Sequence, residues 1–236
     1  MNIKNIILDI LFPKLCLGCG QEGKYICSKC ELFVSEASSI CPVCGGPSFN
    51  GDTHLYCKTK YSLDGLTSVW DYDGLAKQLI YKIKIGGITH IISEVIEDFF
   101  KIIAKDSDRF HSFLSFSISD KNCIAYVPSF KKKEKKRGFN QAEIIAKELG
   151  KISNSKVVSL LKKIIDTKDQ TELSKEERFE NVKAAFAPLS GATASQGNVL
   201  LVDDIFTTGA TMRECCKVLK QSGVKKVWGF TLARTP

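Results

Sequence analysis

The sequence has no apolar run long enough to span a bilayer, so a transmembrane segment is not expected. It contains only three histidines, and these are scattered along the chain. Neither a Ser-His-Asp nor a Cys-His arrangement can be argued from them. The sequence therefore gives no support to a membrane-spanning protein or to a triad hydrolase.

A secretion signal is missing as well. The first residues, MNIKNIILDILFPK, place their apolar side chains at helical spacing, with Asp9 interrupting the run and no small-residue cleavage site after it. We expect a short amphipathic helix that packs on the body of the protein, and peripheral docking on a membrane stays open. Without a signal, the expected compartment is the reducing cytoplasm, where clustered cysteines serve as metal ligands before they form disulfides.

The composition is that of a globular protein with room for one full core and a small accessory module. The 236 residues are 44% hydrophobic and 25% charged, and the formal net charge is +8. A basic excess favours anionic partners such as nucleic acid, phosphate esters or acidic lipid heads. It is equally compatible with simple solvation of the surface.

Cysteine is concentrated at the front of the chain, where two Cys-x-x-Cys pairs lie a short loop apart. They are Cys16 with Cys19 and Cys27 with Cys30. Each pair forms a tight turn that directs two thiolates at one ion, and four thiolates make a closed, structural zinc site. So small a segment has too few apolar residues to fold without a bound metal ion.

A third pair, Cys41 and Cys44, has less obvious partners. Cys57 is available, but Lys60 stands where the second member of its pair would be. His54 could supply a fourth ligand. An incomplete second zinc site and a three-Cys-one-His site therefore stay open as alternatives.

Beyond the cysteine-rich region the composition changes, and we expect two domains, residues 1–60 and 61–236. The second alternates strand-like and helix-like patterns. The expected strands are 66–72, 123–128, 198–205 and 225–234, and the expected helices are 75–85, 90–105, 139–150 and 211–223. Such alternation predicts an α/β fold with a parallel sheet flanked by helices.

The stretch LLVDDIFTTGAT ends a buried strand on two carboxylates, Asp203 and Asp204. In an open α/β sheet, ligands bind beyond the carboxyl ends of the strands. The loop that opens the next helix can cradle a phosphate with its backbone N–H groups and threonine hydroxyls. The loop residues are Thr207, Thr208, Gly209, Ala210 and Thr211. The carboxylates then suit the vicinal hydroxyls of a sugar, with or without Mg²⁺.

This stretch resembles the phosphoribosyl-pyrophosphate motif of type I phosphoribosyltransferases. It is not a Walker A loop, because it lacks the Gly-Lys-Ser/Thr ending. The resemblance implies that Asp203 and Asp204 bind the ribose and that Thr207–Thr211 hold its 5-phosphate, with Mg²⁺ bound alongside. Arg137 is expected on the pyrophosphate side, because an arginine can fork onto two oxygens.

Two further stretches, YVPSFKKKEKKRGFNQAEIIAKEL and DTKDQTELSKEERFENVKAAFA, are similar to segments of the ComF family of late-competence proteins. With the cysteine ribbon, the resemblance covers nearly the whole chain. It implies a protein that binds phosphoribosyl pyrophosphate and handles incoming single-stranded DNA, with competence or DNA-processing proteins as partners. The missing cysteine at Lys60 departs from the pattern of that family. Residues 170–181 are expected to be a loop-like mobile hood over the site.

A run of lysines follows one of the expected strands. Runs of this kind are usually solvated loops, but beside a phosphate site this one forms a positive funnel. Phe130 and Phe139 flank it and can stack on single-stranded bases. The lysines expected to contact nucleic acid are Lys131, Lys132, Lys133, Lys135 and Lys136.

Two other functions stay open. The first is an active phosphoribosyltransferase that releases pyrophosphate as a nitrogen nucleophile takes the sugar; Asp203 and Asp204 would then be its catalytic residues. The sequence shows no base-recognition element for it. The second is a structural zinc-ribbon adaptor with a vestigial transferase fold, which the intact acid pair argues against.

Overall fold

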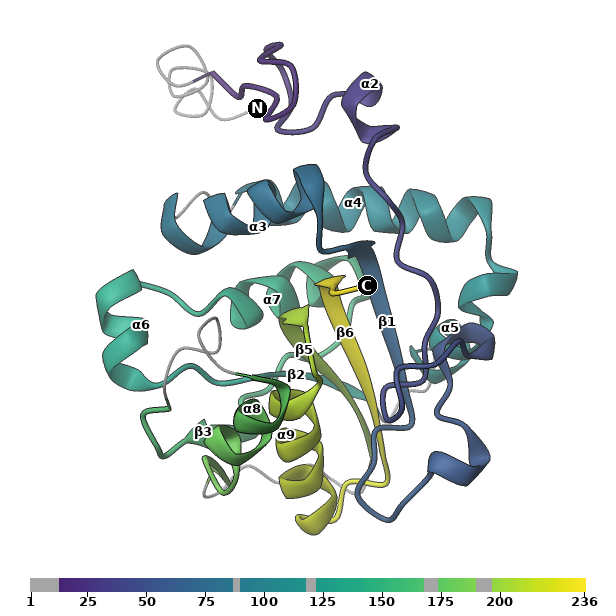
Figure 1. Ribbon diagram of the computed structural model, residues 1–236, viewed down its shortest axis with the longest axis vertical. Coiled ribbons are helices and arrows are strands. Elements are labelled where there is room, and N and C mark those ends of the chain that lie inside the picture. Colours follow the sequence, from purple (N-terminus) through teal and green to yellow (C-terminus); the bar gives the residue numbers. More distant parts are fainter. Residues whose placement is uncertain (1–12, 87–89, 118–121, 168–173, 190–196) are drawn as a thin grey trace.

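The computed structural model describes residues 13–86, 90–117, 122–167, 174–189 and 197–236 (Figure 1). The helix expected at the N-terminus falls within residues 1–12, outside the described part. Among the described residues, no helix combines the length and apolar character that crossing a membrane requires.

A four-stranded parallel sheet forms the centre of the protein, as predicted (Figure 1). Its strand order is β1-β6-β5-β2. The strands are β1 (Gly65–Asp71), β2 (Cys123–Tyr126), β5 (Asn198–Phe206) and β6 (Lys226–Arg234). Because all four run parallel, their carboxyl ends meet at one edge of the sheet.

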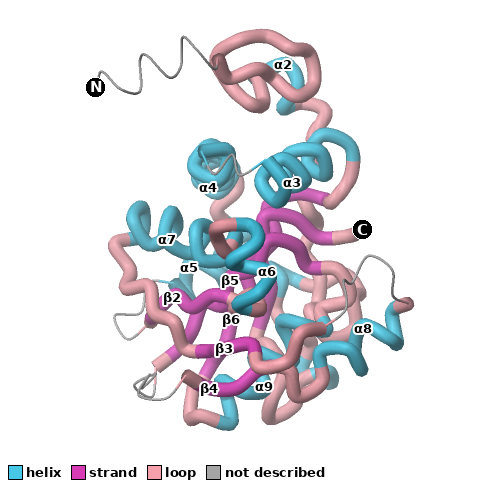
Figure 2. Tube along the Cα trace, turned by 90° about the vertical axis from the view of Figure 1, so that its left-hand side faces the viewer, coloured by secondary structure: helices cyan, strands magenta, loops and turns pink. Residues whose placement is uncertain are grey.

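Helices cover both faces of the sheet (Figure 2). One face packs against α3 (Gly74–Gly86), α4 (His90–Lys105), α5 (His111–Ser117) and α7 (Gln141–Ser153). The other face packs against α9 (Ala210–Gln221), α8 (Lys175–Val182) and an antiparallel pair, β3 (Leu161–Lys163) with β4 (Phe186–Pro188).

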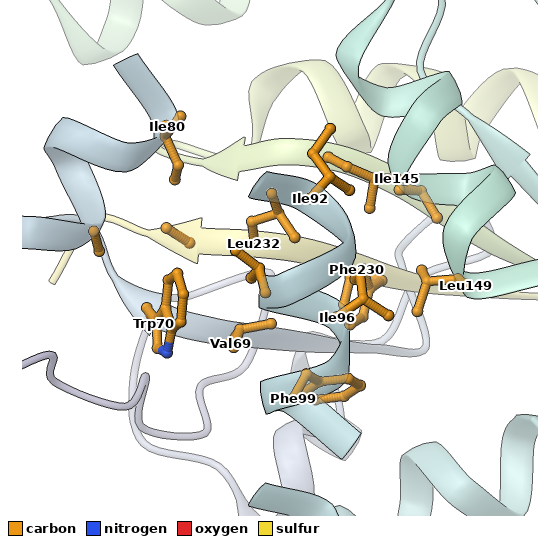
Figure 3. Close-up of a cluster of buried hydrophobic side chains, with 14 of the residues drawn as sticks. Val69, Trp70, Ile80, Ile92, Ile96, Phe99, Ile145, Leu149, Phe230 and Leu232 are labelled. Carbon is orange, nitrogen blue, oxygen red and sulfur yellow. The ribbon is translucent and has the colours of Figure 1, made fainter. Parts of the chain in front are cut away.

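The core on the α4 face follows from the alternation of side chains along β6 (Figure 3). Trp228, Phe230 and Leu232 all point to this face, where they are at most 3% exposed. Phe99 of α4 packs edge-on against Phe230, with 5.1 Å between the ring centroids. Burying an aromatic side chain of this size stabilises the fold by about 2–3 kcal/mol.

On the opposite face, α9 buries the stripe formed by Met212, Cys215 and Leu219, as its spacing predicts. Cys215 is fully buried, which raises the pKa of its thiol well above the ordinary value. A thiol that stays protonated is a packing group and a poor nucleophile. Cys215 therefore packs in the core and is no candidate nucleophile.

Two segments expected to be loops are helical. The lysine run forms α6 (Lys131–Arg137), which Gly138 ends in the left-handed conformation at φ +84°. Lysine, glutamate and arginine are good helix formers, and a glycine after them is a common helix stop. From Lys175 onward the expected hood is α8, which begins with a capping box between Ser174 and Glu177.

The cysteine-rich segment is mostly irregular, with short helices α2 (Ser28–Glu31), η1 (Phe49–Gly51) and η2 (Leu55–Cys57); a further 3-10 turn, η3 (Asp108–Phe110), precedes α5. Its first half lies beyond α3 and α4, away from the sheet (Figure 1). Lys14 forms an ion pair with Glu94 of α4 at 2.9 Å, which holds this half in place. Its second half contacts α9 instead.

Candidate functional site

The acid pair lies near the carboxyl end of β5. The expected strand 198–205 is β5, which continues one residue further to Phe206, so both carboxylates lie inside the strand and Ile205 and Phe206 still pair with β6. Asp203 and Asp204 are therefore held by the sheet itself. A site on a strand is more rigid than one on a loop.

Asp204 is ion-paired with a lysine that the sequence did not single out. Lys84, at the end of α3, places its Nζ atom 2.9 Å from Oδ2 of Asp204. Both side chains are largely covered, with exposures of 30% and 16%. Although burial disfavours its charge, the two carboxylates raise the pKa of Lys84. Lys84 is therefore a fixed cation at the acid pair.

Asp203, the other acid of the pair, is half-buried. Its Oδ1 accepts a hydrogen bond from the backbone N–H of Asp204 at 2.9 Å. Burial, and then repulsion from Asp204, raise the pKa of Asp203 to about 7. A carboxyl group with such a pKa can accept or donate a hydrogen bond near neutral pH.

The loop after β5 has the geometry of an anion-binding turn. Gly209 is the N-cap of α9 and has φ +76°, a conformation that glycine adopts without strain. A Cβ atom there would lie 2.5 Å from Cζ of Phe206. No hydrogen bond to a described residue engages the backbone N–H groups of Thr207, Thr208 and Gly209. Unpaired N–H groups at a helix N-terminus favour an anion.

A second cation lies on the other side of the acid pair. Lys163 of β3 donates a hydrogen bond to Oγ1 of Thr167 at 2.7 Å, and its charge acts on Asp203. Lys133 of α6 donates to the backbone oxygen of Thr167 at 2.9 Å. Burial and the charge of Lys133 lower the pKa of Lys163. The lysine run is thus connected to the site through Thr167.

Arg137, which is predicted on the pyrophosphate side, and four lysines predicted to contact nucleic acid lie exposed on α6. Arg137 is exposed at the end of α6, and no hydrogen bond or ion pair joins it to a described residue of the acid pair or the loop. Asn140 is a structural residue, since its side chain caps α7 and donates to the backbone oxygen of Val127 at 3.0 Å. Lys131, Lys132, Lys135 and Lys136 are exposed on α6.

The first two Cys-x-x-Cys pairs converge. The Sγ atoms of Cys16, Cys19, Cys27 and Cys30 all lie within 4.8 Å of one another. Burial alone would raise the pKa of Cys16, but backbone N–H groups, chiefly that of Cys27, lower it to about 6. A thiolate stabilised in this way suits a metal ion.

A second group of ligand atoms contains Cys41, Cys44, Cys57 and His54, again within 4.8 Å of one another. Nε2 of His54 lies 3.0 Å from the backbone oxygen of Pro47, to which it can donate. That hydrogen bond leaves the lone pair of Nδ1 facing the cysteines, with Sγ of Cys44 at 3.4 Å. Of the two alternatives that the sequence left open, the geometry therefore fits the three-Cys-one-His group.

Sequence reasoning missed three basic residues of this region, Lys84, Lys163 and Arg213. The first two approach the acid pair from α3 and β3. Arg213 follows the phosphate loop by two residues and donates to the second cysteine group. No sequence motif marks these three residues, because each of them contacts or influences residues that are distant in the sequence.

Comparison with known proteins gives the class of the two parts. Residues 7–59 match the double zinc ribbon domain, and residues 135–236 match the phosphoribosyl transferase domain. The chain therefore combines a zinc ribbon with a phosphoribosyltransferase domain. The match to a zinc ribbon is evidence for the predicted structural zinc. The expected domain boundary at residue 60 stays a prediction.

Similar proteins specify the family. The chain is 27% identical to competence protein ComFC of Bacillus subtilis over 91% of this chain and 86% of that protein. It is 26% identical to competence protein F of Haemophilus influenzae, over 96% and 93% of the two chains. It is 27% identical to the DNA utilization protein YhgH of Escherichia coli, over 94% and 98%. These relatives and the two domain matches confirm the predicted resemblance to the ComF family.

Proposed function

We propose that this protein binds phosphoribosyl pyrophosphate together with Mg²⁺ at the carboxyl end of β5. One observation carries the proposal: two carboxylates in the strand are followed by a loop in which the N–H groups of Thr207, Thr208 and Gly209 make no hydrogen bond to a described residue. The first element suits a diol and a cation, and the second suits a phosphate. A ribose 5-phosphate carries both a diol and a phosphate on one sugar.

In this proposal Asp203 and Asp204 accept hydrogen bonds from the ribose hydroxyls, and Thr207–Thr211 hold the 5-phosphate. Lys84 neutralises Asp204 before the ligand arrives and remains close enough to meet the pyrophosphate. Mg²⁺ adds further positive charge beside the polyanion, which lowers the repulsion between the ligand and the acid pair. Arg137 is the expected further contact on the pyrophosphate side.

Isothermal titration calorimetry of the zinc-loaded full chain with phosphoribosyl pyrophosphate tests the proposal. We expect saturable binding with Mg²⁺ and weaker binding without it. Mg²⁺ should be omitted from the buffer rather than chelated, because a chelator would also remove zinc. The variant Asp203→Asn/Asp204→Asn should lose binding, and Asp106→Asn/Asp108→Asn, on the exposed turn before α5, is the matched control. Absence of saturable binding to the wild type would refute the proposal.

A second proposed function, single-stranded DNA binding, is supported by α6. It presents four exposed lysines directly after β2, and Lys133 links it to the site. One of the related proteins is named for DNA utilization, and two others are named for competence. Each phosphate that a lysine neutralises makes binding more sensitive to salt.

Fluorescence anisotropy with a labelled oligothymidylate tests DNA binding at several salt concentrations. Lys135→Ala/Lys136→Ala should weaken binding and reduce the slope of log K against log salt by about 1.4 for two lost contacts to a single strand. Lys225→Ala/Lys226→Ala removes an adjacent exposed pair at the start of β6 and serves as the control. Equal effects of the two double variants would exclude α6 as a specific DNA-binding surface.

We further propose that the two groups of ligand atoms each hold a structural zinc ion. Cys16, Cys19, Cys27 and Cys30 would form the first site, and Cys41, Cys44, Cys57 and His54 the second. Both sites are closed, so they stabilise the ribbons and leave no position for a reacting water. Cysteines that bind zinc must stay reduced, and we therefore propose that the protein acts in the reducing cytoplasm.

A further inference from the structure

Arg213 connects the second cysteine group to the helix of the phosphate loop. Its Nε atom donates to the backbone oxygen of Pro42 at 3.1 Å, and its Nη2 atom donates to that of Val43 at 2.8 Å. Both acceptors lie inside the Cys41-x-x-Cys44 turn. The guanidinium group is therefore fixed to that turn by two hydrogen bonds, so its position depends on the conformation of the turn.

The same side chain contacts the phosphate loop. A Cβ atom at Gly209 would lie 3.2 Å from Nε of Arg213, so the guanidinium closely approaches the glycine backbone. The backbone N–H of Arg213 also donates to the oxygen of Gly209 at 2.9 Å, in the first turn of α9. A displacement of Arg213 should therefore also move Gly209, whose φ of +76° sets the conformation of the loop.

Arg213 and its neighbour also contact α8. The guanidinium carbon lies 5.1 Å from the ring centroid of Phe179. Glu214 accepts a hydrogen bond from the backbone N–H of Ala184 at 3.0 Å, just after α8. The cysteine turn, the phosphate loop and α8 therefore meet at the beginning of α9.

We infer that Arg213 is a positioning residue that transmits the state of the second zinc site to the phosphate loop. This inference rests on the proposed function of that loop. It adds that the second zinc site controls the conformation of the loop. Within the described part of the chain, the first cysteine group has no comparable link to the phosphate loop, because it packs on α3 and α4, with Tyr25 donating to Glu94 of α4 at 3.1 Å. Loss of zinc from the second site should loosen the loop, whereas loss from the first should not.

Amide hydrogen exchange of the ligand-free full chain tests the inference without depending on activity. Cys44→Ser and Cys19→Ser are a matched pair, since each replaces an exposed thiol, one in each group. In Cys44→Ser we expect exchange at residues 207–211 to rise about tenfold, a typical size for coupling between two sites. In Cys19→Ser we expect exchange there to remain as in the wild type. Amides of β6 report whether each variant is folded.

Arg213→Lys tests the connecting side chain, since lysine keeps the charge but cannot donate to two carbonyls in the same fork. It should raise exchange at the loop as Cys44→Ser does, and the double variant should show no additional rise. In titrations with phosphoribosyl pyrophosphate and Mg²⁺, the dissociation constant should rise in Cys44→Ser, in Arg213→Lys and in the double variant, and should stay unchanged in Cys19→Ser. A ligand that fails to bind the wild type would refute the proposed function, but the exchange experiment would still decide the role of Arg213.

Three results would overturn the inference. They are unchanged exchange at the loop in Cys44→Ser, equal changes in Cys44→Ser and Cys19→Ser, and fully additive effects of Cys44→Ser and Arg213→Lys.

Discussion

Lys84 and Asp204 form an ion pair of 2.9 Å between the end of α3 and the acidic part of β5. The lysine lies outside residues 135–236, which match the phosphoribosyl transferase domain, whereas the aspartate lies inside them. The pair therefore joins the first helix after β1 to the centre of the candidate site. It gives the acid pair a cation even when no ligand or Mg²⁺ is bound.

Removing this cation should shift the titration of the neighbouring acid. The charge of Lys84 lowers the pKa of Asp203, which burial and Asp204 raise to about 7. In Lys84→Met we therefore expect the pKa of Asp203 to rise further, as measured by carboxyl-carbon NMR through a pH titration. Lys82→Met, an exposed lysine on the same helix, should leave it unchanged. An unchanged titration in Lys84→Met would show that the ion pair has little influence on the site.

Asp203 should make the protein less stable as the pH rises towards neutrality. Its pKa in the folded state, about 7, lies above the ordinary value of 3.8, so the folded protein retains a proton that the unfolded chain loses. Between about pH 4 and pH 7 the folded state binds more protons, and the contribution of Asp203 to the free energy of unfolding falls as pH rises. Urea unfolding across this range should show a fall that is smaller in Asp203→Asn. A profile identical in both proteins would contradict the raised pKa.

Gly209 should tolerate a side chain much less well than Gly223, a glycine with a similar backbone conformation just beyond the other end of α9. Gly209→Ala introduces both a positive φ and a contact of 2.5 Å with Phe206, whereas Gly223, at φ +96°, has open space around its Cβ position. A left-handed alanine costs about 1–2 kcal/mol. We expect Gly223→Ala to lower the free energy of unfolding by about 1 kcal/mol and Gly209→Ala by about 3 kcal/mol. Chemical denaturation measures both, and equal losses would mean that Phe206 moves aside freely.

The parallel sheet and its edge could be predicted because their determinants are local. The apolar run before Asp203 and the small residues after Phe206 define a strand, a turn and a helix start within fifteen residues. Buried positions on α9, such as Cys215, follow from helical spacing in the same way.

The contacts that complete the site could not be predicted, because they form between distant parts of the chain. Lys84 lies 120 positions before Asp204, and Arg213 lies 170 positions after Val43. From its position in the sequence, neither residue can be distinguished from a basic side chain that is exposed to solvent on a helix. The helices α6 and α8 are different, since their signals were present: good helix formers before Gly138, and Ser174 followed three residues later by Glu177.

His54 should decide whether the second ribbon holds a metal ion. With Nε2 near the oxygen of Pro47 at 3.0 Å, its Nδ1 atom completes a group with Cys41, Cys44 and Cys57. We expect the purified wild type to release two zinc ions per chain when its thiols are modified, and His54→Ala to release one. His54→Cys should restore the second ion, because four thiolates also make a closed tetrahedral site. His111→Ala, an exposed histidine at the start of α5, should release two. Two ions from His54→Ala would exclude the histidine as a ligand, since three thiolates would then hold the metal without it.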